Sequence, residues 1–238
     1  MPRKSILDPR TRRLRFRRNL LAWFRRHGRD LPWRRTRDPY QILVSEVMLQ
    51  QTQVARVTEY WPRFLERFPT VQHLAAATPK HVREAWDGLG YYRRAENLRR
   101  AARDMVTHHQ GEVPRDTAVL RLLPGIGAYT AGAVASFAYE LAEPAIDTNV
   151  ARVLRRAFHP RMRPGAGGDR QLWATAKALV PRAGNIAWTT NQALMELGAL
   201  ICTARVMRCE ICPVRKVCLT GRRDEKRETR DRKQRPTP

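Results

Sequence analysis

The sequence predicts an all-α fold for this chain of 238 residues. Apolar residues recur at helical spacing in several windows, and no sustained run alternates apolar and polar residues as half-buried strands do. Two dipeptides, Asp38-Pro39 and Thr78-Pro79, combine an N-cap residue with a proline in the first helical turn. Because 42% of the residues are hydrophobic and 29% are charged, the chain can bury a sizeable core. We therefore expect one or two ordered helical lobes.

Start and stop signals place the other expected helices in the first two thirds of the chain. Residues 1–30 are basic and carry an apolar segment at 20–24. Asp116 can begin a helix that a Pro-Gly sequence at 124–127 breaks, and a helix of small residues follows through Thr130. These signals predict two helices joined by a tight turn.

The last third contains a predicted loop, a predicted helix and a charged tail. The glycine-rich stretch 164–168 predicts a flexible loop, and residues 191–201 predict a helix that leads into a group of cysteines. The sequence after Cys218 is charged and lacks apolar periodicity. We therefore expect disorder from about residue 221 onward.

The charge balance indicates a polyanionic partner. The chain has 46 basic and 22 acidic residues, and its net charge of +24 attracts nucleic acid. Only six of the basic residues are lysines; a genome rich in arginine codons would explain that ratio but not the net excess. No apolar run approaches the ~20 residues of a membrane span. We expect a soluble, cytoplasmic, nucleoid-associated protein that binds DNA and no membrane.

The Pro-Gly turn has the features of a phosphate-binding hairpin. In Leu123-Pro124-Gly125-Ile126-Gly127 the glycines permit a tight turn and expose backbone N–H groups beside the N-terminus of the next helix, near Thr130. Such donors suit a DNA phosphate without reading the base sequence. An ordinary helix–helix turn would explain the glycines equally well.

The four cysteines form one group, C-x6-C-x2-C-x5-C, made of Cys202, Cys209, Cys212 and Cys218. Four soft ligands within 17 residues favour a tetrahedral metal site or a cubane cluster. Zinc accepts four thiolates but usually takes two separated C-x2-C pairs, and free thiols are the third alternative. A disulfide framework is not expected in a reducing compartment.

The hairpin and the segment that follows it resemble a known family. The helix through Thr130 is followed by Ala145-Ile146-Asp147-Thr148-Asn149-Val150, and this combination resembles the helix-hairpin-helix-GPD superfamily of base-excision glycosylases, which includes endonuclease III and the MutY adenine glycosylases. The resemblance implies that Asp147 is catalytic and that the cysteine spacing holds a [4Fe-4S] cluster. Asp147 is also a suitable N-cap for a helix that starts near Thr148.

Four further segments resemble the MutY branch of this family, and together the resemblance covers roughly residues 15–220. They are residues 31–34, 45–54, 88–92 and 191–199. The resemblance implies a monomer that binds double-stranded DNA with a mispaired or damaged base. It also implies two lobes: an iron–sulfur cluster lobe of residues 1–29 and 142–238, and a six-helix barrel lobe of residues 30–141 that ends in the helix-hairpin-helix at about 116–138.

The same resemblance implies a role for individual side chains. Glu46 would be the acid that protonates adenine, because adenine leaves poorly unless a ring nitrogen is protonated and burial raises the pKa of a carboxyl group. Asp147 would stabilise the sugar cation or form a transient bond to the sugar before water attacks, and Asn149 would orient it. Gln51 and Tyr91 would enter the stack when the base flips, and Gly125, Gly127 and Thr130 would contact DNA phosphate. The base pocket would be lined by Trp33, Arg34, Val54 and Glu196. Without the resemblance, Glu46 would be expected as an exposed helix glutamate.

Tyr129 determines the expected type of reaction. Relatives with lyase activity carry a lysine at this position, whose amine forms a Schiff base with the sugar, and a phenol cannot do so. We therefore expect a monofunctional glycosylase that hydrolyses the bond to adenine opposite guanine or 8-oxoguanine, although Tyr129 alone could be a packed aromatic residue. The alternatives are a glycosylase for thymine or uracil opposite guanine and a non-catalytic iron–sulfur DNA-binding protein.

Typical MutY enzymes have a second, C-terminal domain of about a hundred residues that recognises 8-oxoguanine. The sequence ends at Pro238, so we expect that domain to be lacking. Without that domain, the sequence does not predict which base opposite the adenine the protein prefers.

Overall fold

The chain folds into α-helices and two short 3-10 helices, as a computed structural model of residues 7–163 and 165–222 describes it. Within those residues no strand occurs, apart from an isolated bridge between Cys202 and Met207. The predicted all-α class is confirmed. Disorder is predicted from about residue 221; Gly221 and Arg222 are helical, and the rest of the tail, residues 223–238, lies outside the described residues.

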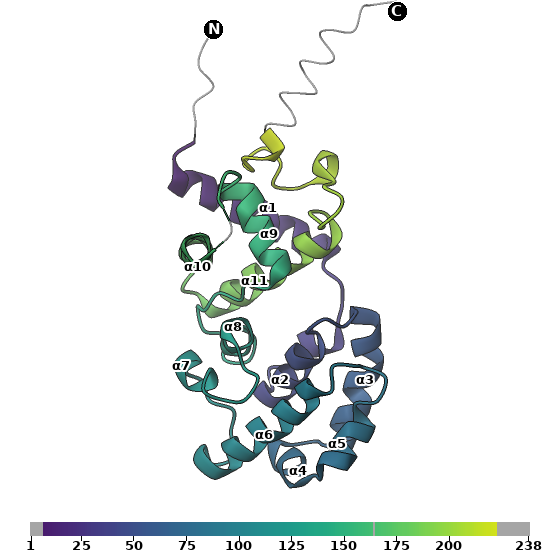
Figure 1. Ribbon diagram of the computed structural model, residues 1–238. Helices are drawn as coiled ribbons and strands as arrows, with labels where there is room; N and C mark the ends of the chain where they lie inside the picture. The colour runs from purple at the N-terminus through teal and green to yellow at the C-terminus, as the bar shows by residue number, and fades with distance from the viewer. Residues whose placement is uncertain (1–6, 164, 223–238) are drawn as a thin grey trace, which may run out of the picture. The chain divides into compact units, whose positions relative to one another are not determined.

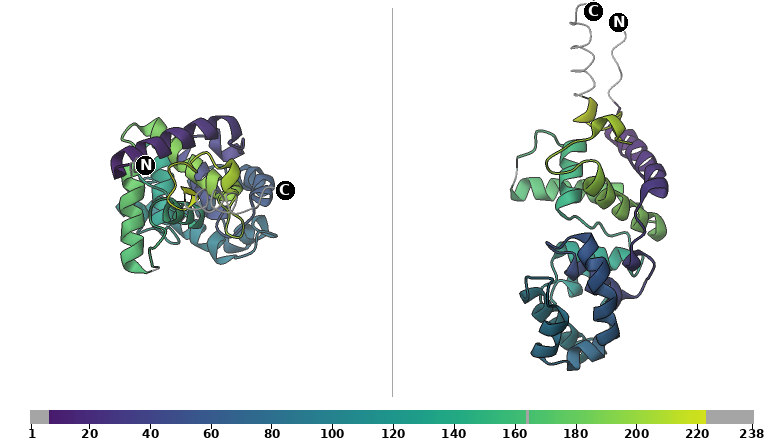
Figure 2. Two further views of the ribbon diagram at one scale, coloured as in Figure 1. Left: turned by 90° about the horizontal axis from the view of Figure 1, so that it is seen from above. Right: turned by 90° about the vertical axis from the view of Figure 1, so that its right-hand side faces the viewer.

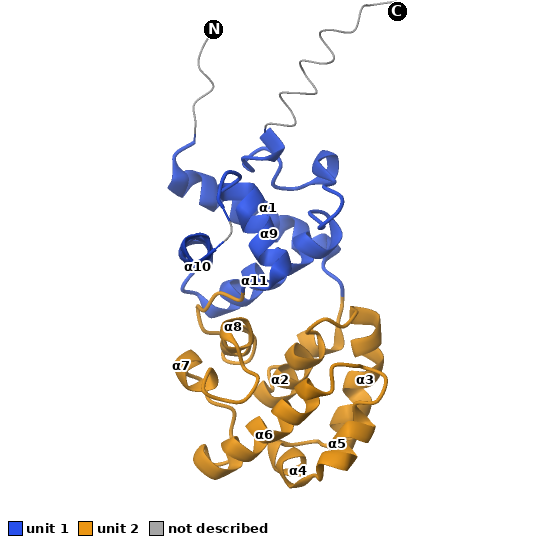
Figure 3. Ribbon diagram, viewed as in Figure 1, with its two compact units in different colours: residues 1–29, 146–238 blue, residues 30–145 orange. Residues whose placement is uncertain are grey.

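The chain divides into two compact units (Figure 3). Unit 1 consists of residues 1–29 and 146–238, and unit 2 consists of residues 30–145. Unit 2 is therefore one continuous segment, whereas unit 1 is assembled from both ends of the chain. The second boundary follows Ala145, four residues later than the 141/142 boundary that the resemblance implies.

Unit 2 contains one 3-10 helix and seven α-helices within its described residues (Figure 1): η1 (Pro32–Arg34), α2 (Pro39–Met48), α3 (Val54–Arg67), α4 (Val71–Ala76), α5 (Pro79–Ala85), α6 (Arg93–His108), α7 (Thr117–Leu120) and α8 (Ala128–Phe137). Helix α2 packs against α3, α6 and α8, and α6 packs against α4 and α5. The helix starts that the sequence predicts are confirmed, because the side chains of Asp38, Thr78 and Asp116 each accept a hydrogen bond from a first-turn N–H group.

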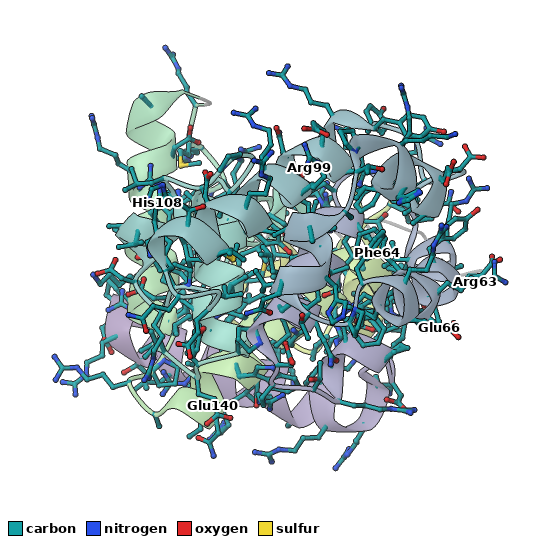
Figure 4. All side chains as sticks on the ribbon, turned by 90° about the horizontal axis from the view of Figure 1, so that it is seen from below. Arg63, Phe64, Glu66, Arg99, His108 and Glu140 are labelled. Carbon is teal, nitrogen blue, oxygen red and sulfur yellow. The ribbon has the colours of Figure 1, made fainter. Side chains whose placement is uncertain are left out.

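The pattern of α3 explains how its helix is held in unit 2. Val57, Trp61 and Phe64 follow helical spacing and are buried, and the ring of Phe64 packs against that of Trp86 with centroids 5.7 Å apart. Figure 4 shows Phe64 among the helices, whereas Arg63 and Glu66 of the same helix reach outward. The apolar side of α3 therefore belongs to the core, and its charged side faces solvent.

The turn between α7 and α8 has the chemistry that its sequence predicts. Ile126 N donates to Leu123 O at 3.1 Å, with Pro124 and Gly125 between them, and Gly125 has a φ of 78°. Proline followed by a glycine with positive φ is the signature of a type II turn. A Cβ added at Gly125 would also lie 2.8 Å from Asn97 Cβ, so both the backbone and the packing require glycine here.

Unit 1 contains α1 (Pro9–His27), α9 (Thr148–Phe158), α10 (Ala166–Leu179), α11 (Gly184–Leu200) and η2 (Cys209–Ile211). Helices α1 and α9 both pack against α10 and α11, and the two orientations of Figure 2 agree with this arrangement. The buried core includes Phe16, Leu20, Leu154, Leu194 and Leu197, which come from three different helices.

The predicted flexible loop at 164–168 is wrong in part, because the last three of these residues belong to a helix. Helix α10 begins at Ala166, with Gly165 as N-cap at a φ of 125°, so Gly167 and Gly168 lie in its first turn. A Cβ at Gly168 would lie 2.6 Å from Arg163 O, which explains a glycine inside this helix. Burial of the apolar face of α10 in the core outweighs the low helix propensity of glycine.

No helix among the described residues combines the length and the apolar character that a membrane span needs.

Candidate active site

Glu46 lies on the last turns of α2, inside unit 2. Its surface is 3% exposed, and its Oε2 accepts a hydrogen bond of 2.5 Å from the hydroxyl of Tyr129 on α8. The packing of α2 against α8 brings these two residues together across 83 positions of sequence. Glu46 is therefore not the exposed helix glutamate that its residue type alone would suggest, and Tyr129 does more than fill space.

Thr130 follows Tyr129 on α8, and its side chain is turned inward. It is 2% exposed, and its Oγ1 accepts a hydrogen bond of 3.3 Å from Gln50 Nε2. The hydroxyl therefore connects the first turn of α8 to the loop after α2, and a contact of Thr130 with DNA stays a prediction. The exposed parts of the hairpin are Gly125 and Gly127, which precede the first turn of α8.

Gln51 and Tyr91 share an uncommon backbone conformation. Both have positive φ values, 56° for Gln51 and 48° for Tyr91, although neither is a glycine. Gln51 is exposed, and Tyr91 is 62% exposed despite its aromatic ring. Such backbone conformations persist only where the surrounding structure imposes them, and they gather at functional sites. The structure therefore presents both expected intercalating side chains to solvent, on strained loops of the same unit.

Three of the four expected base-pocket residues lie in unit 2. Trp33 on η1 is 5% exposed and meets the ring of Trp61 edge-on, with centroids 6.3 Å apart, so it is also a core residue. Arg34 ends η1 and Val54 begins α3, and both are half-buried.

The fourth, Glu196, belongs to α11 of unit 1 and is fully buried. Its Oε1 accepts hydrogen bonds from Arg29 Nε at 2.6 Å and from Arg29 N at 3.1 Å, and its Oε2 accepts one from Arg29 Nη2 at 3.2 Å. A bidentate arginine pair of this kind fixes the carboxylate strongly. Glu196 therefore ties the end of the N-terminal segment to α11, a structural role that the sequence analysis does not predict.

Asp147 caps helix α9 and is held by two donors. Its Oδ1 accepts from Val150 N at 2.7 Å, and its Oδ2 accepts from Asn149 Nδ2 at 2.9 Å. The N-cap interpretation of Asp147 is therefore confirmed, and both oxygens of the carboxylate are oriented. Asn149 is in turn held by Arg152, whose Nη2 donates to Asn149 Oδ1 at 2.7 Å.

Arg152 also connects this aspartate to the segment that carries the first cysteine. Its Nη2 donates to Gly198 O at 2.8 Å, and its Nε donates to Cys202 O at 2.8 Å. Burial lowers the pKa of Arg152, but an arginine starts so high that it stays charged. Helix α9 can approach α11 this closely because residue 198 is a glycine: a Cβ there would lie 2.7 Å from Asn149 Cβ.

The four cysteines line one pocket of unit 1. Residues directly after Cys218 are bound to carbonyl groups at the end of α9. Leu219 N donates to Ala157 O at 2.9 Å, and Thr220 Oγ1 donates to Arg156 O at 2.7 Å. Two sulfur atoms accept hydrogen bonds, Cys202 Sγ from Arg156 Nη1 at 3.3 Å and Cys218 Sγ from Gly221 N at 3.4 Å. N–H donors and a guanidinium group favour thiolate over thiol.

Burial raises the pKa of the Cys212 thiol to about 12. A thiol with this pKa is neutral near pH 7 unless a cation lies beside it. Among the described residues, no three histidine, cysteine or carboxylate side chains are arranged to hold a single metal ion.

The sequence between α2 and the start of α10 matches one family. Residues 44–167 match the model of the HhH-GPD superfamily base excision DNA repair protein. The chain belongs to this superfamily. The matched segment contains Glu46, the hairpin and Asp147. The resemblance that the sequence analysis describes is thereby confirmed at the level of the family.

Curated relatives of this HhH-GPD protein include adenine DNA glycosylases. It is 49% identical over 197 residues to the adenine DNA glycosylase of Mycobacterium tuberculosis (strain ATCC 25618 / H37Rv), which covers 82% of this chain and 64% of that relative. It is 44% identical over 225 residues to the adenine DNA glycosylase of Homo sapiens, which covers 90% of this chain and 40% of that relative. The chain thus spans less than two thirds of the length of these relatives.

Solved structures with the same fold include a thermostable thymine-DNA glycosylase, with a TM-score of 0.81 and 30% identity over 90% of this chain and 98% of that chain. Another is a trapped covalent intermediate of endonuclease III with DNA, with a TM-score of 0.77 and 25% identity over 92% of this chain and 100% of that chain. The predicted helix-hairpin-helix glycosylase fold of this HhH-GPD protein is confirmed by both.

Sequence reasoning misses three arginines of this HhH-GPD protein that orient functional segments: Arg29, Arg94 and Arg152. Each acts on residues distant in sequence, such as Glu196 for Arg29 and Cys202 for Arg152. A chain with 46 basic residues gives no sequence signal that separates these arginines from the others.

Proposed function

We propose that this protein is a DNA glycosylase that excises adenine mispaired with guanine or 8-oxoguanine from duplex DNA, by hydrolysis and without cutting the strand. The observation that carries the proposal is the buried Glu46 carboxyl group, which accepts a hydrogen bond from Tyr129. Adenine leaves readily only when a ring nitrogen is protonated, and burial favours the protonated form of a carboxyl group that can supply this proton. The relatives that are 49% and 44% identical are named adenine DNA glycosylase, which supports this assignment.

In the proposed reaction the two carboxylates have different tasks. Glu46 donates a proton to a ring nitrogen of adenine, and the C1′–N9 bond breaks with its electron pair leaving on the base. Asp147, oriented by Asn149 and Val150 N, stabilises the positive charge that develops on the sugar. Water then adds to C1′, and the proton that it loses returns to the carboxyl group of Glu46. The products are free adenine and an abasic site.

Tyr129 supports the hydrolytic character of the reaction. Its hydroxyl lies 2.5 Å from Glu46 Oε2, so the position that would need an amine for a lyase holds a phenol beside the proposed acid. The tyrosine orients the acid, and no Schiff base can form there. The abasic strand should therefore stay intact until alkali is added.

Several surface features of unit 2 support DNA as the partner. Gly125 and Gly127 are exposed at the hairpin, next to the N-terminus of α8, and their peptide groups suit a phosphate. Gln51 and Tyr91 are exposed and suit the space that a flipped nucleotide leaves in the stack. The net charge of +24 supplies the long-range attraction.

The cysteine pocket supports a [4Fe-4S] cluster held by Cys202, Cys209, Cys212 and Cys218. The rest of the lining is mostly apolar or basic and contains no carboxylate, and Arg156, Arg208 and Arg215 are able to balance the negative charge of four thiolates. A bound cluster would crosslink the loop and so stabilise unit 1. Chemical analysis of the purified protein tests this: four iron and four sulfide per chain support the cluster, and one zinc per chain overturns it.

The function is tested by single-turnover base release from labelled duplexes with adenine opposite 8-oxoguanine, adenine opposite guanine, thymine opposite guanine and uracil opposite guanine. Strand cleavage is measured before and after alkali. Adenine release with nicking only after alkali is the expected result. Release of only thymine or uracil would overturn the assignment to adenine, and release of only thymine would match the activity named for the solved structure that is 30% identical. No release from any duplex would leave a non-catalytic DNA-binding protein.

A further inference from the structure

Arg94 lies in the first turn of α6 and makes an unusual set of contacts. The two terminal nitrogens of its guanidinium group, which carry four N–H groups, lie within hydrogen-bond distance of six acceptors. Nη1 donates to the carbonyl oxygens of Val47, Met48 and Gln50, and Nη2 donates to Thr52 Oγ1 and to the carbonyl oxygens of Leu89 and Gly90. One side chain thus joins the segment after α2 to the loop before α6.

These two segments carry Gln51 and Tyr91, two of the four exposed non-glycine residues with positive φ; the other two, Gln110 and Glu140, lie on other loops of unit 2. Gln51 lies between Gln50 and Thr52, and both of these neighbours accept from Arg94. Tyr91 follows Gly90, which also accepts from Arg94, and the Tyr91 carbonyl accepts from Arg94 N at 2.9 Å. A positive φ in a residue with a side chain costs of order 1–3 kcal/mol and needs surrounding contacts to hold it. Arg94 supplies such contacts next to both residues.

The chemistry of these contacts favours arginine over any other residue. Val47 and Met48 are the last residues of α2, where carbonyl groups have no intrahelical donor and the helix dipole is negative. A planar guanidinium group with donors on both sides can serve this helix end and a second loop at once. Its Nη1 contacts with Val47 O at 3.1 Å and Met48 O at 2.8 Å reach across more than 40 residues of sequence.

The charge of Arg94 is not neutralised by these contacts. Every acceptor is a carbonyl or a hydroxyl, and none of the ion pairs found among the described residues involves Arg94. Its Cζ also lies 5.5 Å from the ring centre of Tyr91 and 5.4 Å from that of Trp86. A cation–π contact of this kind favours one orientation of the exposed Tyr91 ring.

We propose that Arg94 is a positioning residue for base extrusion: its contacts with six acceptors hold the loops of Gln51 and Tyr91 in the strained conformation that enters the base stack. The residue touches neither the base nor the sugar in the proposed chemistry. Its effect on turnover rests on the proposed glycosylase function, whereas its effect on base unstacking does not. Arg94 therefore sets the rate of extrusion, and it leaves DNA affinity and the bond-breaking step largely unchanged.

The test compares Arg94→Lys with Arg93→Lys. Lysine keeps the charge but has three donors on one atom, which cannot serve both loops. Arg93 is the exposed neighbour on the same helix, so its replacement controls for arginine lost from this surface. Extrusion is followed by the fluorescence of 2-aminopurine placed beside the mispaired adenine, and base release is measured under single turnover.

We expect Arg94→Lys to slow both the fluorescence rise and adenine release by about 10- to 100-fold, the range expected when a functional group is misplaced by about 1 Å. Opposite an abasic site, where the target adenine is already unpaired, the loss should shrink to about threefold, because extrusion costs least there. Duplex affinity should change by less than about threefold. A merely structural role would reduce release equally on both substrates, and that result would overturn the proposal.

A second variant keeps the test decisive if Arg94→Lys does not fold. Thr52→Val removes one acceptor and leaves the guanidinium in place, so it should slow the fluorescence rise in the same direction but by less. An unchanged rise in this folded variant would overturn the proposal.

The outcomes also separate this inference from the proposed function. If the wild-type protein releases no adenine but unstacks the probe, and Arg94→Lys alone loses that ability, the inference holds and the glycosylase assignment fails. If the wild-type protein does not unstack the probe, the inference fails even where adenine is released.

Discussion

At the scale of single residues, burial of the Glu46 carboxyl group costs free energy, because the group loses its contacts with water. A carboxyl group with 3% of its surface exposed needs hydrogen bonds or a proton, and Tyr129 supplies one of those hydrogen bonds. Glu46→Gln keeps the shape and can still accept from Tyr129, but it has no acidic proton. We expect single-turnover adenine release to fall by about 10²–10⁴-fold, the usual contribution of a general acid.

The matched control for this variant is Glu66→Gln. Glu66 lies on the outward side of α3, so the same chemical change occurs at an exposed helix position (Figure 4). Release by Glu66→Gln should stay within about twofold of the wild type, as expected for a surface substitution. Equal activity of both variants would exclude Glu46 as the acid.

Tyr129 offers a gain-of-function test at the same site. Tyr129→Lys places an amine beside Glu46, where it can attack C1′ of the sugar and form a Schiff base. We expect borohydride to trap a covalent protein–DNA complex with Tyr129→Lys and none with the wild type. Tyr129→Phe, which removes the hydroxyl without adding an amine, is the control. Trapping with the wild-type protein would contradict the proposed hydrolytic reaction.

At the scale of elements, Asp147 serves the start of α9 as well as the proposed chemistry, and two substitutions separate these tasks. Asparagine caps helices as well as aspartate does. The free energy of unfolding of Asp147→Asn should therefore lie within about 0.5 kcal/mol of the wild-type value, whereas that of Asp147→Ala should be lower by about 1 kcal/mol. Both should lose about 10²–10³-fold in adenine release, because neither carries the negative charge. Chemical denaturation and single-turnover assays check the two effects. Full activity of Asp147→Asn would limit Asp147 to its cap.

The contact between α9 and α11 depends on Gly198. Gly198→Ala would place a Cβ 2.7 Å from Asn149 Cβ and 3.0 Å from Asn149 O, so the helices must separate. We expect a loss of about 1–3 kcal/mol in the free energy of unfolding, typical of overpacking, and slower release through the displaced Asn149.

Gly167→Ala is the control for Gly198→Ala, because a Cβ at position 167 meets no atom within 4 Å. There the substitution should leave stability unchanged or raise it by about 0.5–1 kcal/mol, as alanine does inside a helix. A similar loss in the free energy of unfolding for both variants would mean that the close contact between α9 and α11 does not explain the need for glycine at position 198.

Local signals explain why many elements could be predicted from the sequence. Asp38, Thr78, Asp116 and Asp147 each cap the helix that follows, and capping involves residues two or three positions away. The start of α10 was not predictable in this way. Glycine is required at position 168 because Arg163 O lies too close for a side chain. Propensity says nothing about such contacts.

The candidate site was predictable only in part. The resemblance supplied Glu46, Asp147 and the cysteines, and Glu46 proved to be buried next to Tyr129. The inward side chain of Thr130 was not predictable, because the packing of α2 against α8 decides it. Arg94 was missed for the same reason, since its acceptors lie up to 47 residues away in sequence.

At the scale of the whole molecule, the chain order places all the ligands of the proposed cluster in one of the two units. Unit 2 is a continuous segment with its own core, whereas unit 1 combines residues 1–29 with the segment after residue 145 and contains all four cysteines. Part of its cohesion comes from long-range contacts, such as Arg29 with Glu196 and the cysteine loop with the end of α9.

Removal of iron should therefore destabilise one unit selectively. Because a metal that binds only the folded state adds its binding free energy to folding, loss of the proposed cluster should loosen unit 1 and leave unit 2 protected. We expect hydrogen exchange, measured by mass spectrometry after treatment with a chelator and oxidant, to rise in α9 and α11 and to stay unchanged in α2, α6 and α8. A Cys209→Ser protein should show the same pattern without treatment. Equal deprotection of both units, or none in unit 1, would contradict a cluster that stabilises unit 1.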